Sequence, residues 1–351
     1  MISRDEAKNK LDNLIKKSRV HLYKPIQIAE ILYHDRIYKN IDLSDVESYR
    51  AASKHWRDDI TFPLLGRVCT SSSKFQDNLF EPNAMPPQVI EVLGKENRKT
   101  KGAVEAYIYG LFLKKHLQLA EALDYCLNAT KENFDVKQFM DSFWNEPGLR
   151  RSIDKIYEIV VYSLFSTLVT SLEIKVEVSV SEDKIEMLEE FLDFAKMVMC
   201  IDKDKKSNVQ DAGIYRVGVT NAADRGLDMF ANWGAAIQVK HLSLDENLAE
   251  EIVNSVSCDK IIVVCKDAEK NIIRSLLNQI GWQSHIQDII TEQDLIEWYE
   301  KALRGKYSDE LGAKLIACMC EEIAEEFPAV CDIPNELKDR HYEQIENDFW
   351  I

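Results

Sequence analysis

The hydrophobic and polar positions along the chain predict a helical first part followed by a region of short strands. Over residues 1–92 apolar residues recur at helical spacing, and Ser44 is placed to cap the helix that follows it. Residues 103–130 and 135–171 predict two longer helices whose apolar positions indicate burial. The segment 94–102 between these parts predicts a basic loop and a boundary, since it contains four Lys or Arg residues and two glycines.

The pattern changes after residue 171. Residues 172–181, LEIKVEVSVS, alternate strictly between apolar and polar positions and predict an amphipathic strand. Residues 182–199 then predict a helix, because the acidic residues at its start suit the positive end of the helix dipole. The polar stretch 202–213 predicts a solvated linker.

Beyond residue 213 short strands are expected to alternate with helices. Strands are expected at 214–220, 227–231, 235–242, 260–265 and 285–290, and helices at 244–257, 267–280 and 292–303. The order of helix, three consecutive strands, helix, strand and helix resembles the core of the PD-(D/E)xK nucleases, a mixed α/β sheet flanked by helices. Those nucleases hold an acid on one strand and an (E/D/Q)-x-K sequence on the next. From residue 306 the pattern is helical and acidic, and it leaves the order of this tail open.

A predicted hairpin at 226–242 carries the matching residues. Its loop is expected at 232–234, because Gly suits the left-handed position that ends a three-residue loop. With that loop, residues whose numbers sum to 466 face each other, so Asp228 lies opposite Gln238 with Cβ atoms roughly 5 Å apart. Lys240 lies two residues further along the same face. The three side chains would therefore form one polar cluster.

This cluster has the chemistry that phosphodiester hydrolysis needs. Asp228, the Gln238 side-chain carbonyl and the Val239 backbone carbonyl are hard oxygen ligands for Mg²⁺, which prefers few protein ligands and several waters. Lys240 would orient the attacking water and stabilise developing negative charge. Gln in place of the commoner acid removes one negative charge, so another acid should compensate. The candidates left open are Glu186, Glu189, Glu190 and Asp224.

The alternative interpretation of the cluster is a solvated polar strand face. Two further pairs, Glu173 with Lys175 and Asp204 with Lys206, also have the acid-x-Lys spacing. The first has no acid on a preceding strand, and the second lies in a polar stretch. Of these patterns, the one at 238–240 has the structural context of a nuclease site.

The charge distribution permits nucleic-acid binding although the formal net charge is −16. Residues 1–120 contain 20 Lys and Arg against 15 Asp and Glu, whereas the other residues contain 24 against 45. Candidate DNA contacts lie in this more basic part, in the polar segment 67–76 and the basic segment 94–102. They are Arg67, Lys74, Arg98, Lys99 and Lys101.

Several function classes lack support in the sequence. The eight cysteines include no CxxC pair, which disfavours a zinc site and indicates reduced thiols in the cytoplasm. The apolar run 156–172 approaches membrane-spanning length, but Glu158 and five Ser or Thr residues interrupt it, so a buried helix and no membrane association are expected. Neither a P-loop nor a dinucleotide fingerprint occurs, so no nucleotide cofactor is expected.

The segment YRVGVTNAADRGLDMFANWGAAIQVKHLSL (215–244) resembles the signature region of the HaeII-type restriction endonucleases. KPIQIAEILYHDR, LLGRVCTSS and NAMPP are similar to the N-terminal region of the same family. The resemblance implies a type II restriction endonuclease of PD-(D/E)xK fold, which uses Mg²⁺ to cut double-stranded DNA at a purine-GCGC-pyrimidine site. It also implies that the family's catalytic acid, glutamine and lysine correspond to Asp228, Gln238 and Lys240.

The sequence thus predicts three regions: a helical, DNA-wrapping part at 1–171, a nuclease core at 172–305 and an acidic helical tail at 306–351. A palindromic target favours a homodimer in which each subunit cuts one strand. Alternatives are a repair or recombination nuclease of the same fold, a non-catalytic DNA-binding protein, and a helical interaction protein. Cleavage of a plasmid with Mg²⁺ would separate them.

Overall fold

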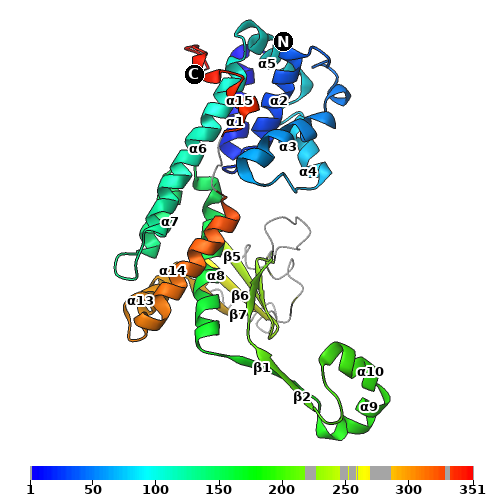
Figure 1. The fold of residues 1–351 in the computed structure, drawn as a ribbon, viewed down its shortest axis with the longest axis vertical. Helices are drawn as coiled ribbons and strands as arrows, with labels where there is room; N and C mark the ends of the chain where they lie inside the picture. Colours follow the sequence, from blue (N-terminus) through cyan, green and yellow to red (C-terminus); the bar gives the residue numbers. More distant parts are fainter. Residues whose placement is uncertain are drawn as a thin grey trace.

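A computed structural model describes residues 2–217, 227–245, 252, 258, 260–268, 286–328 and 333–350. A helical N-terminal region lies at one end of the molecule, a five-stranded sheet with its flanking helices forms the middle, and a projecting arm forms the other end (Figure 1). The polypeptide is therefore a mixed α/β protein, as the sequence predicts.

The N-terminal region is helical, which confirms the prediction for residues 1–92. Its helices are α1 (Arg4–Lys17), α2 (Tyr23–Ile37), α3 (Ala52–Leu65), α4 (Ser73–Asp77), α5 (Pro87–Lys99) and α6 (Ala103–Leu127), with short 3-10 turns η1 (Val46–Ser48) and η2 (Asn78–Phe80). Their apolar faces share one core that includes Leu11, Ile28 and Leu93. Burial of these faces, rather than intrinsic propensity, supplies most of the stability of such short helices.

Two predictions in this region are wrong in detail. Ser44 caps no helix: its hydroxyl donates to Asp42, while the Asp45 side chain caps the η1 turn and α3 begins only at Ala52. The basic segment 94–102 is not a loop over most of its length, because α5 continues to Lys99. Gly94 allows α5 to pack closely against Leu43, since a Cβ at this position would meet the Leu43 side chain.

The second helical run is broken where the sequence predicted one helix over 135–171. It consists of α7 (Val136–Asn145), the 3-10 turn η3 (Arg150–Ser152) and α8 (Ile153–Ser171). Helix α8 packs on β3 and β5 of the central sheet, although the sequence division at residue 171 placed it with the N-terminal region. No helix in the described part of the chain is long and apolar enough to cross a membrane.

The central sheet has the strand order β3-β4-β5-β6-β7. The strands are β3 (Ile214–Arg216), β4 (Met229–Ala231), β5 (Ala235–Leu244), β6 (Lys260–Ala268) and β7 (Ile286–Thr291). β3 pairs antiparallel with β4, and β4 pairs antiparallel with β5. The pairs β5–β6 and β6–β7 are parallel. All five strands were predicted; the helices expected at 244–257 and 267–280 lie almost entirely outside the described residues.

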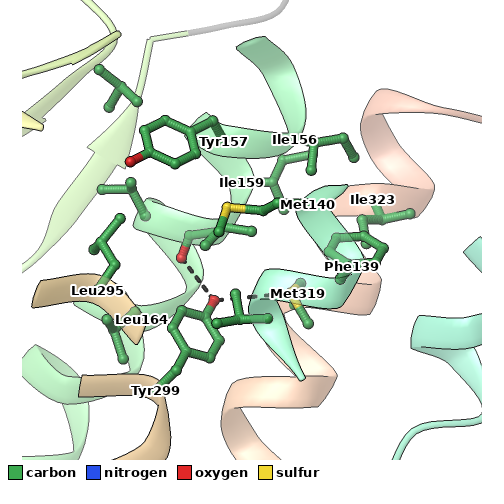
Figure 2. Close-up of a cluster of buried hydrophobic side chains, with 14 of the residues drawn as sticks. Phe139, Met140, Ile156, Tyr157, Ile159, Leu164, Leu295, Tyr299, Met319 and Ile323 are labelled. Carbon is green, nitrogen blue, oxygen red and sulfur yellow. Dashed lines mark hydrogen bonds between the residues drawn. The ribbon is translucent and has the colours of Figure 1, made fainter. Parts of the chain in front are cut away.

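Helices from three parts of the chain bury one face of this sheet. Figure 2 shows Ile159 and Leu164 of α8 packed with Phe139 of α7 and with residues of two C-terminal helices, α13 (Glu292–Arg304) and α14 (Ser308–Glu326). The Tyr299 hydroxyl of α13 donates to the Val160 carbonyl at 2.8 Å, which satisfies a polar group inside the core. The sheet therefore rests on a closely packed apolar layer.

The segment between α8 and β3 forms an arm that stands apart from this core. Among the residues that the structure describes, strands β1 (Lys175–Ser179) and β2 (Ser207–Asp211) pair only with each other. Between them lie the turn η4 (Glu182–Lys184), α9 (Ile185–Glu190), α10 (Leu192–Phe194) and the π-helical segment η5 (Ala195–Met199). The stretch 202–213 is therefore no simple linker, because it supplies β2. Helix α8, not 182–199, is the helix that precedes the three core strands and covers them.

The C-terminal tail returns to the N-terminal region (Figure 1). It contains α15 (Asn335–Lys338) and the turn η6 (Tyr342–Gln344), and Trp350 is only 2% exposed. The Arg340 guanidinium forms a buried ion pair with Glu30, whose Oε1 lies 2.6 Å away. Residues 333–350 are thus part of the N-terminal core, which settles the order of this part of the tail.

Candidate active site

The hairpin of β4 and β5 has the predicted register. Met229 pairs with Ile237 and Phe230 with Ala236, and both pairs satisfy the expected sum. Gly234 ends the loop with a φ of +103°, a left-handed conformation that favours glycine. The loop residue that the sequence singled out therefore sets which side chains face each other across the hairpin.

Hydrogen bonds join Asp228 to the strand opposite it. The Val239 backbone N–H donates to Asp228 Oδ2 at 2.8 Å, and the Gln238 side-chain amide donates to the same oxygen. Asp228 itself lies directly before β4, where its backbone carbonyl accepts from the Val217 N–H at 2.9 Å. The structure thus brings Asp228 and Gln238 together, as the register predicted.

The cluster is not a solvated strand face, because Gln238 is buried and Asp228 and Lys240 are half-buried. Gln238 is 1% exposed, and β5 is buried from Ala235 through Val239. Neighbouring strands flank β5 on both edges, and apolar clusters cover both of its faces, as is typical of a central strand. Lys240 is half-buried. A buried polar group normally has a partner, yet Gln238 Oε1 has none among the described residues.

The surroundings of Asp228 disfavour its charged form. Burial raises its pKa above the usual range, while the Val239 N–H, the nearby Lys240 and Lys155, and the Gln238 amide lower it in part. Two cations therefore lie close enough to Asp228 to stabilise its charged form. A desolvated acid with specific cationic neighbours in a cleft is characteristic of functional sites.

Glu158 on α8 is a second acid at this site, and the sequence interpretation missed it. Its carboxylate lies 2.5 Å from Lys155 Nζ. Burial raises the pKa of Glu158, Lys155 lowers it, and the negative charge of Asp228 raises it further. In the sequence, Glu158 was considered only as a charge that interrupts the apolar run 156–172. The signal that could have revealed its role is an acid with a lysine three residues before it inside an otherwise buried helix.

The acids proposed from sequence to complete the site lie elsewhere. Glu186, Glu189 and Glu190 are exposed on α9 of the arm, which Figure 1 shows well away from β5. Asp224 lies outside the described residues. The structure therefore does not bring the three glutamates to Asp228, and the acid that feels the charge of Asp228 is Glu158 of α8.

The oxygen atoms at the site fit a hard cation such as Mg²⁺. No group of three or more His, Cys, Asp or Glu side chains with metal-site geometry occurs within the described ranges. Two carboxylates and one neutral oxygen are nevertheless enough for Mg²⁺, which retains several waters. The unpartnered, buried Oε1 of Gln238 is the observation that supports such a ligand role. Asp228 and Gln238 could hold the ion, and Glu158 lies close enough to add negative charge.

A large cavity connects this site to the N-terminal region. Its volume is about 1090 Å³, and Asp228, Lys155 and Val217 line it on the side of the sheet. Five cationic residues line it from the N-terminal helices and loops: Lys17, Arg19, Lys24, Arg57 and Arg67. A concave surface with clustered Lys and Arg attracts a polyanion and focuses its electrostatic potential.

The candidate DNA contacts from sequence divide into two groups. Arg67 lines the cavity, and its guanidinium contacts the Glu326 carbonyl of α14. Lys74 is not a lining residue itself, but it lies on α4, next to the lining residues Phe75 and Gln76. The other three do not line it: Arg98 and Lys99 end α5 and Lys101 lies in the following turn. The Arg98 side chain forms an ion pair with Asp35.

Other conspicuous residues near the hairpin belong to the core. His241 is buried between Trp144 and Tyr157, with ring centroids 5.2 and 5.0 Å away, and burial lowers its pKa. Cys265 is fully buried in β6. Both agree with their interpretation from sequence as core residues rather than catalysts.

Comparison with known proteins identifies the family of this chain. A family model described as HaeII restriction endonuclease matches residues 7–342. The chain is 55% identical over 338 residues to "Type II restriction enzyme HaeII" of Haemophilus aegyptius, covering 96% of each chain. It is also 55% identical to "Type II restriction enzyme NgoBI" of Neisseria gonorrhoeae over 94% of this chain and 93% of that one. No solved structure matches. The chain belongs to the HaeII restriction endonuclease family.

Proposed function

We propose that this type II restriction endonuclease cuts double-stranded DNA at the β4–β5 hairpin, with Asp228, Gln238 and Lys240 as its catalytic residues. The observation that carries the proposal is the position of Asp228. Its carboxylate is fixed by Gln238 and the Val239 N–H, and it lies on the wall of a large cavity lined by cations. A duplex that enters the cavity would place a phosphate against this carboxylate and Lys155.

Mg²⁺ is the proposed cofactor. When bound, it supplies a Lewis acid that polarises the scissile phosphate and lowers the pKa of a bound water. Asp228, the Gln238 side-chain oxygen and the Val239 carbonyl would hold it, and Glu158 supplies the negative charge that glutamine lacks. This ligand set needs no residue from the arm.

The amino-acid side chains then have separate tasks in the hydrolysis. Lys240 orients the attacking water and stabilises negative charge as the water oxygen bonds to phosphorus and the P–O bond to the leaving oxygen breaks. Lys155, paired with Glu158, faces the same cavity and neutralises phosphate charge. Burial strengthens both effects, because charges interact more strongly where water is excluded.

The fold proposed for this core is that of the PD-(D/E)xK nucleases. An acid next to β4 and Gln-x-Lys on β5 lie on adjacent strands of a mixed sheet that α8 covers. The proposed division keeps a DNA-wrapping N-terminal region, a nuclease core and a C-terminal tail. Because α8 carries Glu158 and packs on the sheet, the core begins functionally with this helix rather than after residue 171.

The proposed target is the palindrome purine-GCGC-pyrimidine, cut in the cytoplasm by a homodimer without a nucleotide cofactor. A two-fold symmetric site is matched by two subunits that each cut one strand. Such an enzyme forms one half of a restriction-modification system.

Digestion of a plasmid of known sequence tests the proposal. With Mg²⁺ we expect discrete fragments whose ends all map to purine-GCGC-pyrimidine, and no cleavage in EDTA. Fragments at another sequence would overturn the proposed target. Smearing or preference for branched DNA would indicate the repair class, and specific binding without cutting would indicate a non-catalytic protein.

A further inference from the structure

Two cysteines from distant parts of the chain meet where α6 packs against α14. Both thiols are free, and Cys126 Sγ lies 3.7 Å from Cys320 Sγ, although 194 positions separate the two residues in the sequence. Cys126 lies one residue before the end of α6, and Cys320 lies in the second half of α14. The two sulfur atoms are therefore in contact while the thiols are reduced.

The two thiols differ in their access to solvent. Cys126 is fully buried in the core below the central sheet, whereas Cys320 is partly exposed at the border of that core. The hydrogen bond between the thiols lowers the pKa of Cys320, which burial and Glu321 raise only in part. The same hydrogen bond, together with burial, raises the pKa of Cys126. Because oxidation of a thiol follows its thiolate character and its exposure, Cys320 is the more reactive of the two.

The distance between the sulfur atoms is short enough for a covalent bond to form. A disulfide has about 2.05 Å between its sulfurs. Closure from the observed 3.7 Å therefore needs a small shift, which rotation of the two side chains can supply. Cys318, two residues earlier on α14, is also partly exposed, but its thiol forms hydrogen bonds with Ser163 and Thr167 of α8. It is thus a matched cysteine with different partners.

We propose that Cys126 and Cys320 form a reversible disulfide when the enzyme meets a hydroperoxide such as hydrogen peroxide. The Cys320 thiolate attacks one peroxide oxygen, the O–O bond breaks, and the leaving hydroxide takes up the proton that Cys320 released. The Cys126 sulfur then attacks the sulfur of the sulfenic acid. The S–S bond forms, the S–O bond breaks, and hydroxide leaves with the Cys126 proton as water. The two thiols lose two electrons in total, and the peroxide is reduced to two waters.

The disulfide would close a long loop of the chain. Between Cys126 and Cys320 lie α7, α8, the arm, all five strands of the central sheet and α13. A bond that closes so long a loop restricts the unfolded chain and thereby stabilises the folded one. Helix α14 also carries Glu322 and Glu326, which form ion pairs with Arg216 of β3. The bond would anchor the helix that supports this edge of the sheet, and the oxidised enzyme should be the more heat-stable form.

Peptide mapping of the full-length protein tests the bond, and it needs neither DNA nor Mg²⁺, so it does not depend on the proposed function. Reduced protein is treated with hydrogen peroxide, the remaining thiols are blocked with iodoacetamide, and tryptic peptides are analysed without reduction. We expect a peptide pair whose fragmentation places the link between Cys126 and Cys320, and we expect dithiothreitol to remove it.

Matched variants assign the bond to this pair of sulfurs. C320S should abolish the link, whereas C318S, two positions away on the same helix, should retain it. C126A, which keeps the buried position apolar, should abolish the link as well. Absence of the link in peroxide-treated wild type would overturn the proposal. A link that persists in C320S, or one that joins two copies of the chain on a non-reducing gel, would also overturn it.

A reagent that traps sulfenic acids tests the roles of the two thiols. In C126A the sulfenic acid at Cys320 has no resolving thiol, so dimedone should label Cys320 about 10-fold more than in wild type. In C320S the buried Cys126 should stay unlabelled. Labelling of Cys126 in C320S at the rate seen for Cys320 in C126A would overturn the proposed order of attack.

Thermal unfolding measures the effect of the bond on stability. Peroxide-treated wild type should have a Tm about 5 °C higher than the same sample after dithiothreitol. This comparison separates the disulfide from methionine oxidation, because methionine sulfoxide is restored by dedicated reductases and not by a simple thiol. C320S should show no difference between the two samples. A wild-type difference near zero would overturn the stabilising effect of the bond.

Discussion

The β4–β5 hairpin and the β1–β2 arm have similar sequence patterns but differ in how far their polar residues are buried. Both are antiparallel pairs with an acid or amide two residues before a lysine, Gln238-x-Lys240 in one and Glu173-x-Lys175 in the other. In the hairpin, β6 joins the second edge of β5, so that Gln238 becomes buried and Lys240 half-buried. In the arm, no third strand joins β1 and β2 within the described part of the chain, and the ion pair of Lys175 with Asp211 is exposed.

The comparison shows that burial, not spacing, distinguishes a site from a pattern. An exposed lysine and carboxylate exchange water freely and contribute little to stability or function. A buried carboxylate such as Asp228 must be held by donors and cations, and it keeps that fixed arrangement for a substrate. Substitutions in the hairpin should therefore affect DNA cleavage much more than matched substitutions in the arm.

The largest expected difference is in cleavage. Asp228→Asn and Lys240→Ala should each reduce the cleavage rate by about 100-fold or more, because each removes a group that acts on the phosphate or the water. Specific DNA binding in Ca²⁺ should persist, since neither residue contacts base edges. The rates are measured on plasmid in Mg²⁺ and the affinities by gel shift.

The matched controls lie in the arm. Asp211→Asn and Lys175→Ala break an ion pair of the same chemistry and should leave the cleavage rate within about 2-fold of wild type. If the arm variants lost as much activity as the hairpin variants, burial would not distinguish the regions. Near-normal cleavage by Asp228→Asn would show that the site is elsewhere.

The positive charge around the two regions should differ in its effect on DNA affinity. Alanine at Lys17, Arg19 and Lys24 of the cavity should reduce the slope of log K against log salt concentration by about 2 to 3, close to one per lost phosphate contact. The same substitutions at three arm lysines should leave the slope unchanged. The control residues are Lys203, Lys205 and Lys206.

The basic residues predicted from sequence provide the intermediate case. Alanine at Arg98, Lys99 and Lys101 should flatten the salt slope by less than the cavity set, because they do not line the cavity and Arg98 is already paired with Asp35. An effect larger than that of the cavity set would place the DNA over the α5–α6 turn instead.

These cases indicate how much of the molecule the sequence could predict. The hairpin register followed from one glycine and from chain geometry, which are local properties, and β6, β7 and α13 followed from their periodicity. The positions of α8 and of segment 182–199 did not follow, because the sequence predicts a helix of suitable length in both and only tertiary packing selects the one that covers the sheet. Glu158 was missed for the same reason.

The Mg²⁺ requirement tests Gln238, the residue whose buried oxygen has no partner in the described structure. Gln238→Glu adds a negative charge without changing the shape of the side chain, so half-maximal cleavage should occur at a Mg²⁺ concentration lower by about 10-fold, a change of 1.4 kcal/mol. Gln238→Leu should raise the requirement or abolish cleavage. The rate is titrated against Mg²⁺ for the three proteins, and three superimposable curves would show that Gln238 holds no metal.

The smallest effect concerns stability, and its sign opposes the effect on activity. Burial raises the pKa of Asp228, so the folded state disfavours the charged form at neutral pH. Asp228→Asn removes that charge, and its side-chain oxygen can still accept from Gln238 and the Val239 N–H. We therefore expect the inactive variant to be more stable than wild type at pH 8 by about 1 kcal/mol, or roughly 2 °C in Tm.

The pH dependence fixes the cause of this stabilisation. A carboxyl group whose folded-state pKa is raised destabilises the protein above that pKa, and the penalty disappears as the pH falls toward the unfolded value of about 4. The Tm difference between Asp228→Asn and wild type should thus be largest at pH 8 and shrink steadily toward pH 4. Asp211→Asn, in the exposed pair of the arm, should show no stabilisation at any pH.

A Tm difference for Asp228→Asn that stays constant with pH would assign the effect to packing. A variant less stable than wild type at pH 8 would mean that Lys155 and Lys240 stabilise the Asp228 carboxylate more than burial destabilises it. In that case the carboxylate would be held by its cations as a structural ion pair, and the contrast between hairpin and arm would be one of packing alone.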